Sequence, residues 1–111
     1  MYKDVTIGSK TVGMAANALS PYLYKIVFHE DFLRAIQKDD PDPDIFVKMG
    51  FIFMKQAEEK DLSKLTKLNE NDFYKWVQEY EPLEIVLASG EISSLYYAQA
   101  KSSSVPKSGP G

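Results

Sequence analysis

The chain has 111 residues, a formal net charge of −3 and no cysteine. This length suits one domain. An acidic balance, with lysines scattered among acids, argues against a nucleic-acid-binding protein, which normally carries a basic patch. Without cysteine, a disulfide framework and a cysteine-based zinc site are excluded, and the composition fits a reducing cytoplasm. The opening residues, MYKDVTIGSK, lack the apolar core of a secretory signal.

The first predicted element is a β-hairpin over residues 3–14. Val5 and Ile7 alternate with polar residues before a Gly-Ser-Lys loop, and Val12 and Met14 alternate after it. Two period-2 runs joined by a short glycine-containing loop are typical of a hairpin. Two strands alone are marginally stable in water. We therefore expect the hairpin to lie on the chain's own helices or to join a sheet of another subunit, and the sequence leaves both alternatives open.

A helical pattern covers residues 21–38. Ser20 is the expected N-cap and Pro21 the first helical residue, because these residue types are favoured at these positions. The helix is either continuous or broken near His29, and we favour a break because Glu30-Asp31 resembles a new helix start. His29, the only histidine, is interpreted as a packed or partly exposed residue rather than as a metal ligand.

Residues 43–60 form the segment around which the rest of the chain is expected to fold. Its apolar residues spread over about 260° of a helical wheel, and only Lys48, Lys55 and Glu59 form a polar stripe. Such a helix has to be covered on most sides. It is too short and too interrupted by lysines to span a membrane. We therefore expect it to be the core of the domain.

Two shorter segments follow the central helix. Residues 61–68 are a leucine-bearing connector with room for one helical turn. The next helix covers residues 70–80, with Asn69 as the expected N-cap and Asp72 at its third position. We interpret the apolar stripe of this helix as core rather than as a binding platform. The stripe comprises Phe73, Trp76, Val77 and Tyr80.

The last predicted helix, residues 82–100, has two apolar sides. One side comprises Leu83, Val86, Leu87 and Tyr97, and the other comprises Ile85, Ala88, Ile92, Leu95 and Tyr96. Two apolar sides exceed what so small a domain easily covers, so this helix is expected to meet a partner. The predicted protein-interaction residues are Ile85, Ile92, Leu95, Tyr96 and Tyr97. Self-association is expected through three of them, Ile92, Leu95 and Tyr96.

Gly90 lies in the middle of this helix, where glycine costs about 1 kcal/mol relative to alanine, and a close packing contact would account for it. Residues 101–111, KSSSVPKSGPG, are expected to be a flexible tail. The predicted architecture is one mainly α (α+β) domain, residues 1–100, of four to five helices with an N-terminal β-hairpin.

No constellation in the sequence predicts catalysis. Aspartates in residues 39–44 resemble a calcium loop, but the central glycine and terminal glutamate of an EF-hand are missing and two prolines intervene. The Gly-Ser-Lys run at residues 8–10 lacks the further glycines and the following helix of a phosphate loop. The serines lack a histidine–acid partner pattern. We therefore expect no enzyme activity, no metal and no cofactor.

Several stretches spread over nearly the whole chain carry a recognisable order of elements. They are KDVTIGSKTV, SPYLYKIVFHEDFLRAI, FMKQAEE, NENDFYKWVQEYEP and the final acidic-aliphatic helix with its Ser/Lys/Pro tail. Together they resemble the small tail assembly chaperones of long-tailed (siphovirus-like) bacteriophages and prophages of Gram-positive bacteria. The resemblance is one of pattern and not of a catalytic fingerprint. The linker DLSKLTKLNEND departs from it, because this linker is longer than the family pattern.

The resemblance implies a protein made in the host bacterial cytoplasm and absent from the mature virion. Such a protein binds the tape-measure protein, a long helical chain prone to aggregation, and keeps it soluble until the tail tube assembles. The resemblance also implies self-association into a ring or spiral. A minor form, extended through a translational frameshift, is implied to contact the tail tube protein. Neither nucleic acid nor a membrane is an expected partner.

Two other hypotheses compete with this one. The first is a structural head–tail connector or minor tail protein that is retained in the virion. The second is a small transcriptional regulator, against which the lack of a basic recognition helix argues. The sequence leaves open which tape-measure segment is bound and how many copies form an oligomer.

Overall fold

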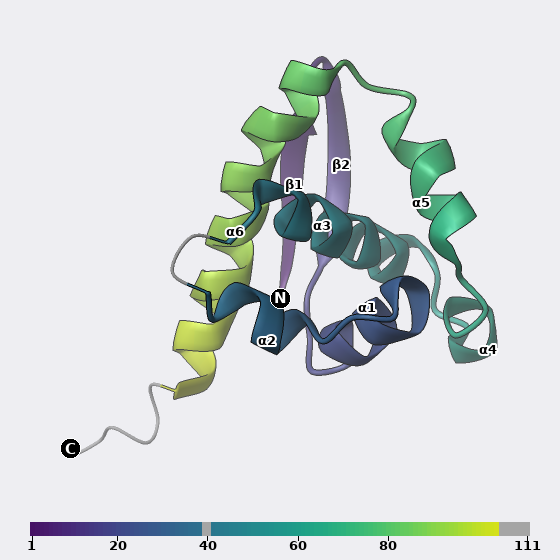
Figure 1. Cartoon of the computed structure of the whole chain (residues 1–111), viewed down its shortest axis with the longest axis vertical. Coiled ribbons are helices and arrows are strands. Elements are labelled where there is room, and N and C mark those ends of the chain that lie inside the picture. Colours follow the sequence, from purple (N-terminus) through teal and green to yellow (C-terminus); the bar gives the residue numbers. More distant parts are fainter. Residues whose placement is uncertain (39–40, 105–111) are drawn as a thin grey trace.

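The structure, a computed structural model, describes residues 1–38 and 41–104. Within these residues the chain forms a two-stranded antiparallel hairpin followed by six helices (Figure 1). The elements are β1 (Tyr2–Ile7), β2 (Lys10–Ala15), α1 (Ser20–Phe28), α2 (Phe32–Ile36), α3 (Pro43–Glu58), α4 (Leu62–Leu65), α5 (Glu70–Val77) and α6 (Pro82–Ser104). The predicted mainly α fold with an N-terminal hairpin is confirmed, and the short helices α2 and α4 bring the number of helices above four to five.

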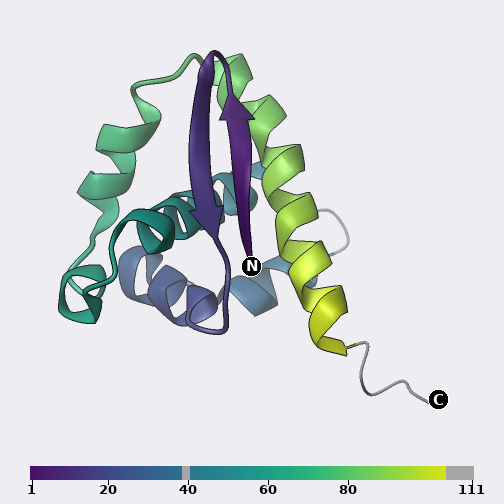
Figure 2. The same ribbon diagram turned by 180° about the vertical axis from the view of Figure 1, so that it is seen from behind.

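The hairpin lies on the chain's own helices. Its register pairs Val5 with Val12, and Gly8 opens the two-residue loop at φ 64°, a conformation that glycine adopts without strain. Val5, Ile7 and Met14 are buried, because β1 packs on α6 and β2 packs on α3. Figure 2 shows the hairpin in front of α3 and beside α6. The hairpin therefore does not need a sheet of another subunit to cover its apolar side.

The break predicted near His29 is confirmed. His29 caps α1 in a left-handed conformation, at φ 55° and ψ 37°, and the Asp31 side chain caps α2 by accepting a backbone hydrogen bond. The predicted start of α1 is wrong by one residue, because the N-cap is Leu19. Ser20 is instead inside the helix, where its buried hydroxyl donates a hydrogen bond to Gln56 Oε1 at 2.5 Å.

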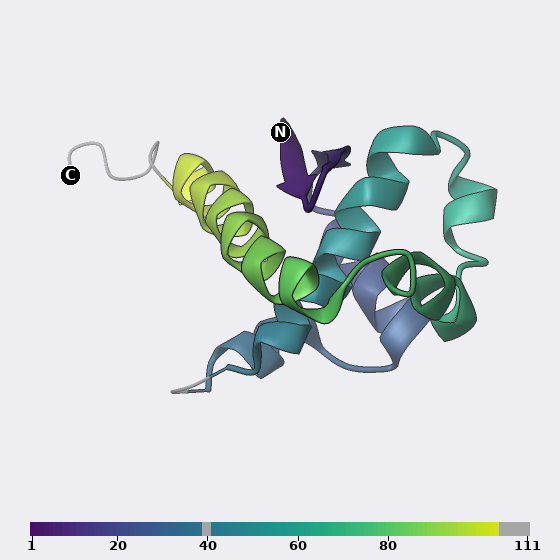
Figure 3. The same cartoon turned by 90° about the horizontal axis from the view of Figure 1, so that it is seen from above.

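Helix α3 is the core of the domain, as its sequence predicts. It is surrounded by α1, the hairpin and α6, and α5 packs beside it (Figure 3). Lys48 lies 5.4 Å from the centre of the Phe28 ring, and Lys55 lies 5.8 Å from that of Phe51. These distances are measured from the lysine Nζ atoms, so both ammonium groups lie over aromatic rings as cation–π contacts. This explains how an almost wholly apolar helix carries two lysines.

Helices α4 and α5 complete the cover of α3. The predicted capping box is present: the Asn69 side chain accepts from the Asp72 N–H at 3.2 Å, and Asp72 accepts from the Asn69 N–H at 3.0 Å. The rings of Phe73 and Trp76 lie 5.7 and 5.9 Å from that of Phe51. The stripe interpreted as core is thus core at these two residues. Helix α5 ends at Val77, earlier than residue 80.

The boundaries of the remaining segments differ in part from the predictions. Asp42 caps α3 by accepting from the Asp44 N–H at 3.0 Å, while residues 39–40 of the predicted turn lie outside the described residues. Helix α6 continues through Ser104, four residues into the range predicted as a flexible tail. The rest of that range, residues 105–111, lies outside the described residues. Among the residues that the structure describes, no helix is long and apolar enough to cross a membrane.

Candidate protein-binding surface on α6

Helix α6 is held against the core by one of its two apolar sides. Ala88, Ile92 and Leu95 are at most 3% exposed. The Ile92 side chain lies on Gly50 of α3, so close that a Cβ at residue 50 would overlap with Ile92 Cδ1. This contact fixes the rotation of α6 about its axis, because the large side chain fits only where α3 has no side chain of its own.

The predicted interaction residues therefore do not form one surface. Ile92 and Leu95 lie in the core, Ile85 is half-buried, and the Tyr96 ring packs 5.0 Å from that of Phe32. Only Tyr97, at 48% exposure, reaches well into solvent. The predicted self-association contact at Ile92, Leu95 and Tyr96 is corrected accordingly, because these side chains already pack within the chain.

Burial also changes the ionisation of the Tyr96 hydroxyl. Burial raises the pKa of the Tyr96 hydroxyl, and the nearby Tyr97 hydroxyl raises it further. The two rings lie 5.2 Å apart but belong to different sides of the helix, as adjacent helical residues do. Tyr97 also approaches Phe46 at the start of α3, with ring centres 6.1 Å apart.

The opposite side of α6 is exposed and apolar. Its members recur at helical spacing and fall within about 100° of a helical wheel. We call them the outer stripe; they are Leu83, Val86, Leu87, Gly90, Ser94 and Tyr97. Leu83, Val86 and Leu87 are 66%, 55% and 68% exposed. From Leu83 to Tyr97 the stripe runs about 21 Å along the helix, at the edge of the molecule (Figures 1 and 3).

Hydrogen bonds within the helix also satisfy the hydroxyl groups of two of its serines. The Ser93 hydroxyl donates to the backbone oxygen of Gly90 at 3.2 Å, and the Ser89 hydroxyl donates to that of Val86 at 2.6 Å. Glu84 turns away from the stripe toward the hairpin loop at Gly8 and accepts from the Glu81 N–H at 3.0 Å. The polar groups of Ser89, Ser93 and Glu84, which neighbour the outer stripe along the helix, are thus bonded to the chain itself.

Gly90 belongs to this stripe, and the packing contact predicted for it is wrong. Among the described residues, no atom lies within 4 Å of the place where a Cβ of residue 90 would stand. The helix glycine that packs closely is Gly50 instead. Residue 90 lies seven residues from both Leu83 and Tyr97, and this spacing places it on the outer stripe.

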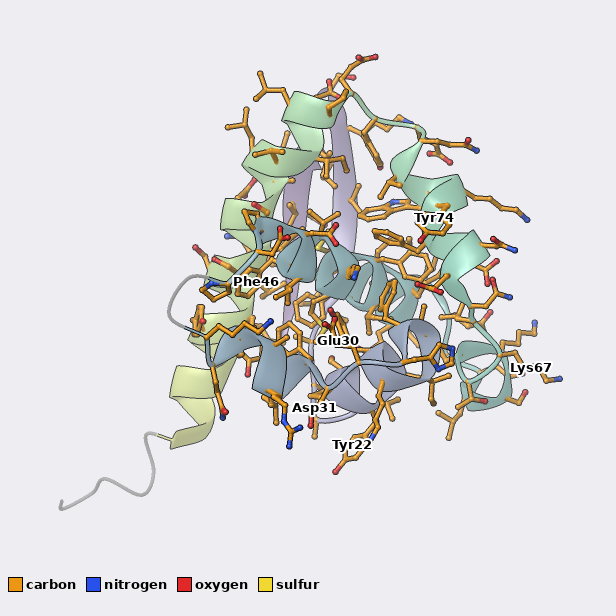
Figure 4. All side chains as sticks on the ribbon, in the orientation of Figure 1. Tyr22, Glu30, Asp31, Phe46, Lys67 and Tyr74 are labelled. Atoms are coloured by element: carbon orange, nitrogen blue, oxygen red, sulfur yellow. The ribbon has the colours of Figure 1, made fainter. Side chains whose placement is uncertain are left out.

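Other exposed apolar side chains are spread over separate helices. Tyr22 and Ile26 share a face of α1, and Tyr22 points away from the body of the molecule (Figure 4). Leu62 of α4 and Tyr74 of α5 are exposed singly. Scattered exposed residues of this kind are normal on soluble proteins. The outer stripe differs because it is continuous along one helix.

A groove of about 570 Å³ lies between β2, α3 and α5. Met54, Trp76 and Tyr80 are among its lining residues. Its charged side chains are paired in part, because Lys55 contacts Glu58 at 3.2 Å on its wall. Among the described residues, no group of three or more histidines, cysteines or carboxylates is placed to hold a metal ion.

No protein-family model, curated protein or solved structure matches this chain.

Proposed function

We propose that this chain is a non-catalytic tail assembly chaperone, which binds a phage tape-measure protein in the host bacterial cytoplasm and keeps it soluble for tail tube assembly. The observation that supports a binding role most strongly is the outer stripe of α6. The identity of the partner rests on the resemblance of the sequence to such chaperones.

The spacing of the stripe suits a helical client. Leu83, Val86, Leu87 and Gly90 follow the i, i+3, i+4, i+7 pattern by which apolar anchors meet an amphipathic helix. A tape-measure protein is a long helical chain whose apolar faces stay uncovered until the tube forms around it. A chaperone for such a chain needs exposed apolar surface at helical spacing and has no need of a reaction centre.

The stripe is also presented rigidly. The opposite side of α6 is anchored by Ile92 on Gly50 and by Tyr96 on Phe32, so the outer side chains are displayed without any unfolding of the domain. A rigid, pre-formed surface loses less conformational entropy on binding than a flexible one. This favours capture of a client before the client aggregates.

The experiment that tests this function is co-expression of the chain with the tape-measure protein encoded by the same genome. The native chain is expected to keep the tape-measure protein in the soluble fraction. Leu87→Asp is expected to leave it in the pellet, because a charge in the middle of an apolar contact costs about 2 kcal/mol or more. Leu62→Asp is the matched control, since Leu62 is 55% exposed on another helix. Solubilisation that survives Leu87→Asp unchanged contradicts the proposed surface.

The alternative function is a head–tail connector or minor tail protein that stays in the particle. The exposed stripe also suits such a permanent structural contact. Mass spectrometry of purified mature virions separates the two roles. A chaperone is expected to be absent from the particle, whereas a stoichiometric amount of this chain in it overturns the chaperone assignment. An extended frameshift form that joins the tail tube protein, and a ring or spiral of copies, remain parts of the same proposal.

A further inference from the structure

The outer edge of β2 carries backbone groups that point away from β1. The Met1 N donates to the Ala16 oxygen at 2.9 Å, and the Ala16 N donates to the Met1 oxygen at 2.8 Å. In an antiparallel pair such bonded pairs alternate with pairs whose N–H and C=O groups point outward. In the register of this hairpin, the outward groups of β2 therefore belong to Thr11, Gly13 and Ala15. Among the described residues, no backbone hydrogen bond from another element reaches Thr11 or Gly13.

This edge opens into the groove between β2, α3 and α5. Thr11 and Gly13 are among the residues that line the groove, whose volume is about 570 Å³. Thr11 is exposed and Gly13 is half-buried. Figures 1 and 2 show that β2 lies on the side of the hairpin that faces α5, while β1 lies beside α6. The free edge of the sheet and the groove therefore form one site.

Tyr2 holds the glycine of this edge in place. Glycine inside a strand weakens it, and an aromatic ring packed across the glycine offsets this loss. The Tyr2 ring lies so close to Gly13 that a Cβ of residue 13 would overlap with Tyr2 Oη, and the Tyr2 hydroxyl donates to Asp4 at 2.9 Å. The edge is thus pre-formed, which lowers the entropy cost of binding a ligand there.

The walls of the groove restrict which chain can pair with the edge. An open strand edge is a template for one further strand. Because α5 stands on the far side of the groove, a sheet cannot continue beyond the first added strand. The β2 edge of a second copy is walled by its own α5, which argues against pairing of two copies through these edges. The site therefore suits a single extended segment.

The side chains of the groove define the chemistry of that segment. Side chains of a strand alternate between its two faces, so every second side chain of an added strand points to the buried side, where Met54 and Trp76 lie. The charged side chains of the groove and its end comprise three lysines and three carboxylates, so neither sign prevails. They are Lys10, Lys55, Lys75, Glu58, Asp72 and Glu79.

We propose that the groove binds an extended, uncharged segment of another protein, with apolar residues at alternate positions, which adds to β2 as a third strand. Its backbone bonds to Thr11 and Gly13, which are about 7 Å apart along the strand, and its apolar side chains pack on Met54 and Trp76. In this mode the main-chain hydrogen bonds supply affinity and the contacts of alternate side chains supply specificity. The site is distinct from the outer stripe and does not rest on the proposed function.

Amide hydrogen exchange of the native chain, followed by NMR, tests the added strand with the probe acetyl-Thr-Val-Thr-Val-Thr-amide. Saturating peptide is expected to slow exchange at Thr11 and Gly13 at least about fivefold and to leave Val12, already paired with Val5, unchanged. The same peptide with N-methyl groups on its three central residues is expected to have no effect, because it lacks the donors. Equal protection by both peptides, or none by either at millimolar concentration, overturns the proposal. Protection of both amides before peptide is added also overturns it, since the edge is then already occupied.

A matched pair of proline variants locates the binding edge. Thr11 and Thr6 face each other in the hairpin, and the N–H of each points away from the partner strand, so proline removes no ladder bond at either position. Trp76 is the only tryptophan, and its fluorescence reports occupancy of the groove. Thr11→Pro is expected to weaken peptide binding about tenfold, and Thr6→Pro is expected to leave it unchanged. Equal affinity in the two folded variants, checked by circular dichroism, contradicts binding at the β2 edge.

The outcome is separable from that of the proposed function. Leu87→Asp changes the outer stripe and is expected to leave peptide binding in the groove unchanged, whereas a loss of peptide binding contradicts the separation of the two surfaces. Peptide binding together with failure to solubilise the tape-measure protein retains the groove and removes the chaperone role. Solubilisation without peptide binding does the reverse.

Discussion

Ile92 of α6 rests on Gly50 of α3, with its Cδ1 so close that a Cβ of residue 50 would overlap with it. Gly50→Ala is therefore expected to destabilise the fold, although alanine is the better helix former. Overpacking in a core costs about 1–3 kcal/mol, and helix propensity returns only about 1 kcal/mol of this. Equilibrium urea denaturation is the measurement.

Gly90→Ala is the matched control for this substitution. Residue 90 is also inside a helix, but its missing Cβ faces open space among the described residues. We expect a gain of up to about 1 kcal/mol at concentrations where the chain is monomeric. Adding Ile92→Val to Gly50→Ala should recover part of the stability that Gly50→Ala alone loses. A change of the same sign at both glycines contradicts the assigned contact.

Leu95 and Leu87 separate the core side of α6 from the outer stripe. Leu95→Asp places an unpaired carboxylate at a site that is 2% exposed, so we expect loss of the cooperative thermal transition in circular dichroism. Leu87→Asp is expected to change stability by no more than about 0.5 kcal/mol. A folded Leu95→Asp variant or an unfolded Leu87→Asp variant would show that α6 is rotated about its axis relative to the structure.

A buried polar network joins the start of α1 to α3. The Ser20 hydroxyl donates to Gln56 Oε1 at 2.5 Å, and Gln56 Nε2 donates to Asn17 Oδ1 at 2.9 Å. Gln56→Leu leaves the buried Ser20 hydroxyl without its acceptor, which costs about 1–3 kcal/mol. Adding Ser20→Ala is expected to relieve part of this loss. Strict additivity of the two changes in chemical denaturation counts against the network.

Stability is expected to fall in alkaline solution because of Tyr24. Burial, and secondarily the hydrogen bond to Glu30 at 2.8 Å, raise the pKa of the Tyr24 hydroxyl above its ordinary value. The folded chain then keeps this proton at a pH where the unfolded chain, with a tyrosine pKa of about 10, has lost it. The contribution is complete below about pH 10 and declines above it.

Denaturation curves at several pH values above and below that range measure this effect. Tyr24→Phe should make the alkaline loss of stability shallower, although part of it remains because burial also raises the pKa of Tyr80 and Tyr96. Tyr22→Phe is the control, since Tyr22 is exposed and its removal should leave the slope unchanged. An identical slope in Tyr24→Phe and the native chain rejects the assignment.

Much of the fold follows from local sequence signals. The hairpin, the break at His29, the core position of α3 and the capping box at Asn69 are each set by residues close together in the chain. Their energetics are local: turn conformation, side-chain capping and one-sided burial. The N-cap at Leu19 was missed because Ser20 bonds to Gln56, 36 residues away, and no local rule carries that information.

The orientation of α6 could not be obtained in the same way. Both of its sides are apolar, so helical periodicity identifies the two sides without saying which one packs against the core. The choice depends on the fit of Ile92 to Gly50 and of Tyr96 to Phe32, contacts between segments far apart in the sequence. Gly90 was misassigned for the same reason, since the close contact belongs to the glycine of the other helix.

The most direct test of the outer stripe as a protein-binding surface is site-specific photocrosslinking during co-expression with the tape-measure protein. A photoreactive phenylalanine analogue is placed at residue 87 of the stripe, and in a separate sample at residue 62 of α4. We predict a crosslink to the tape-measure protein from position 87 and none from position 62, because only the stripe offers continuous apolar surface. A crosslink from position 62 without one from position 87 contradicts the binding surface proposed for α6.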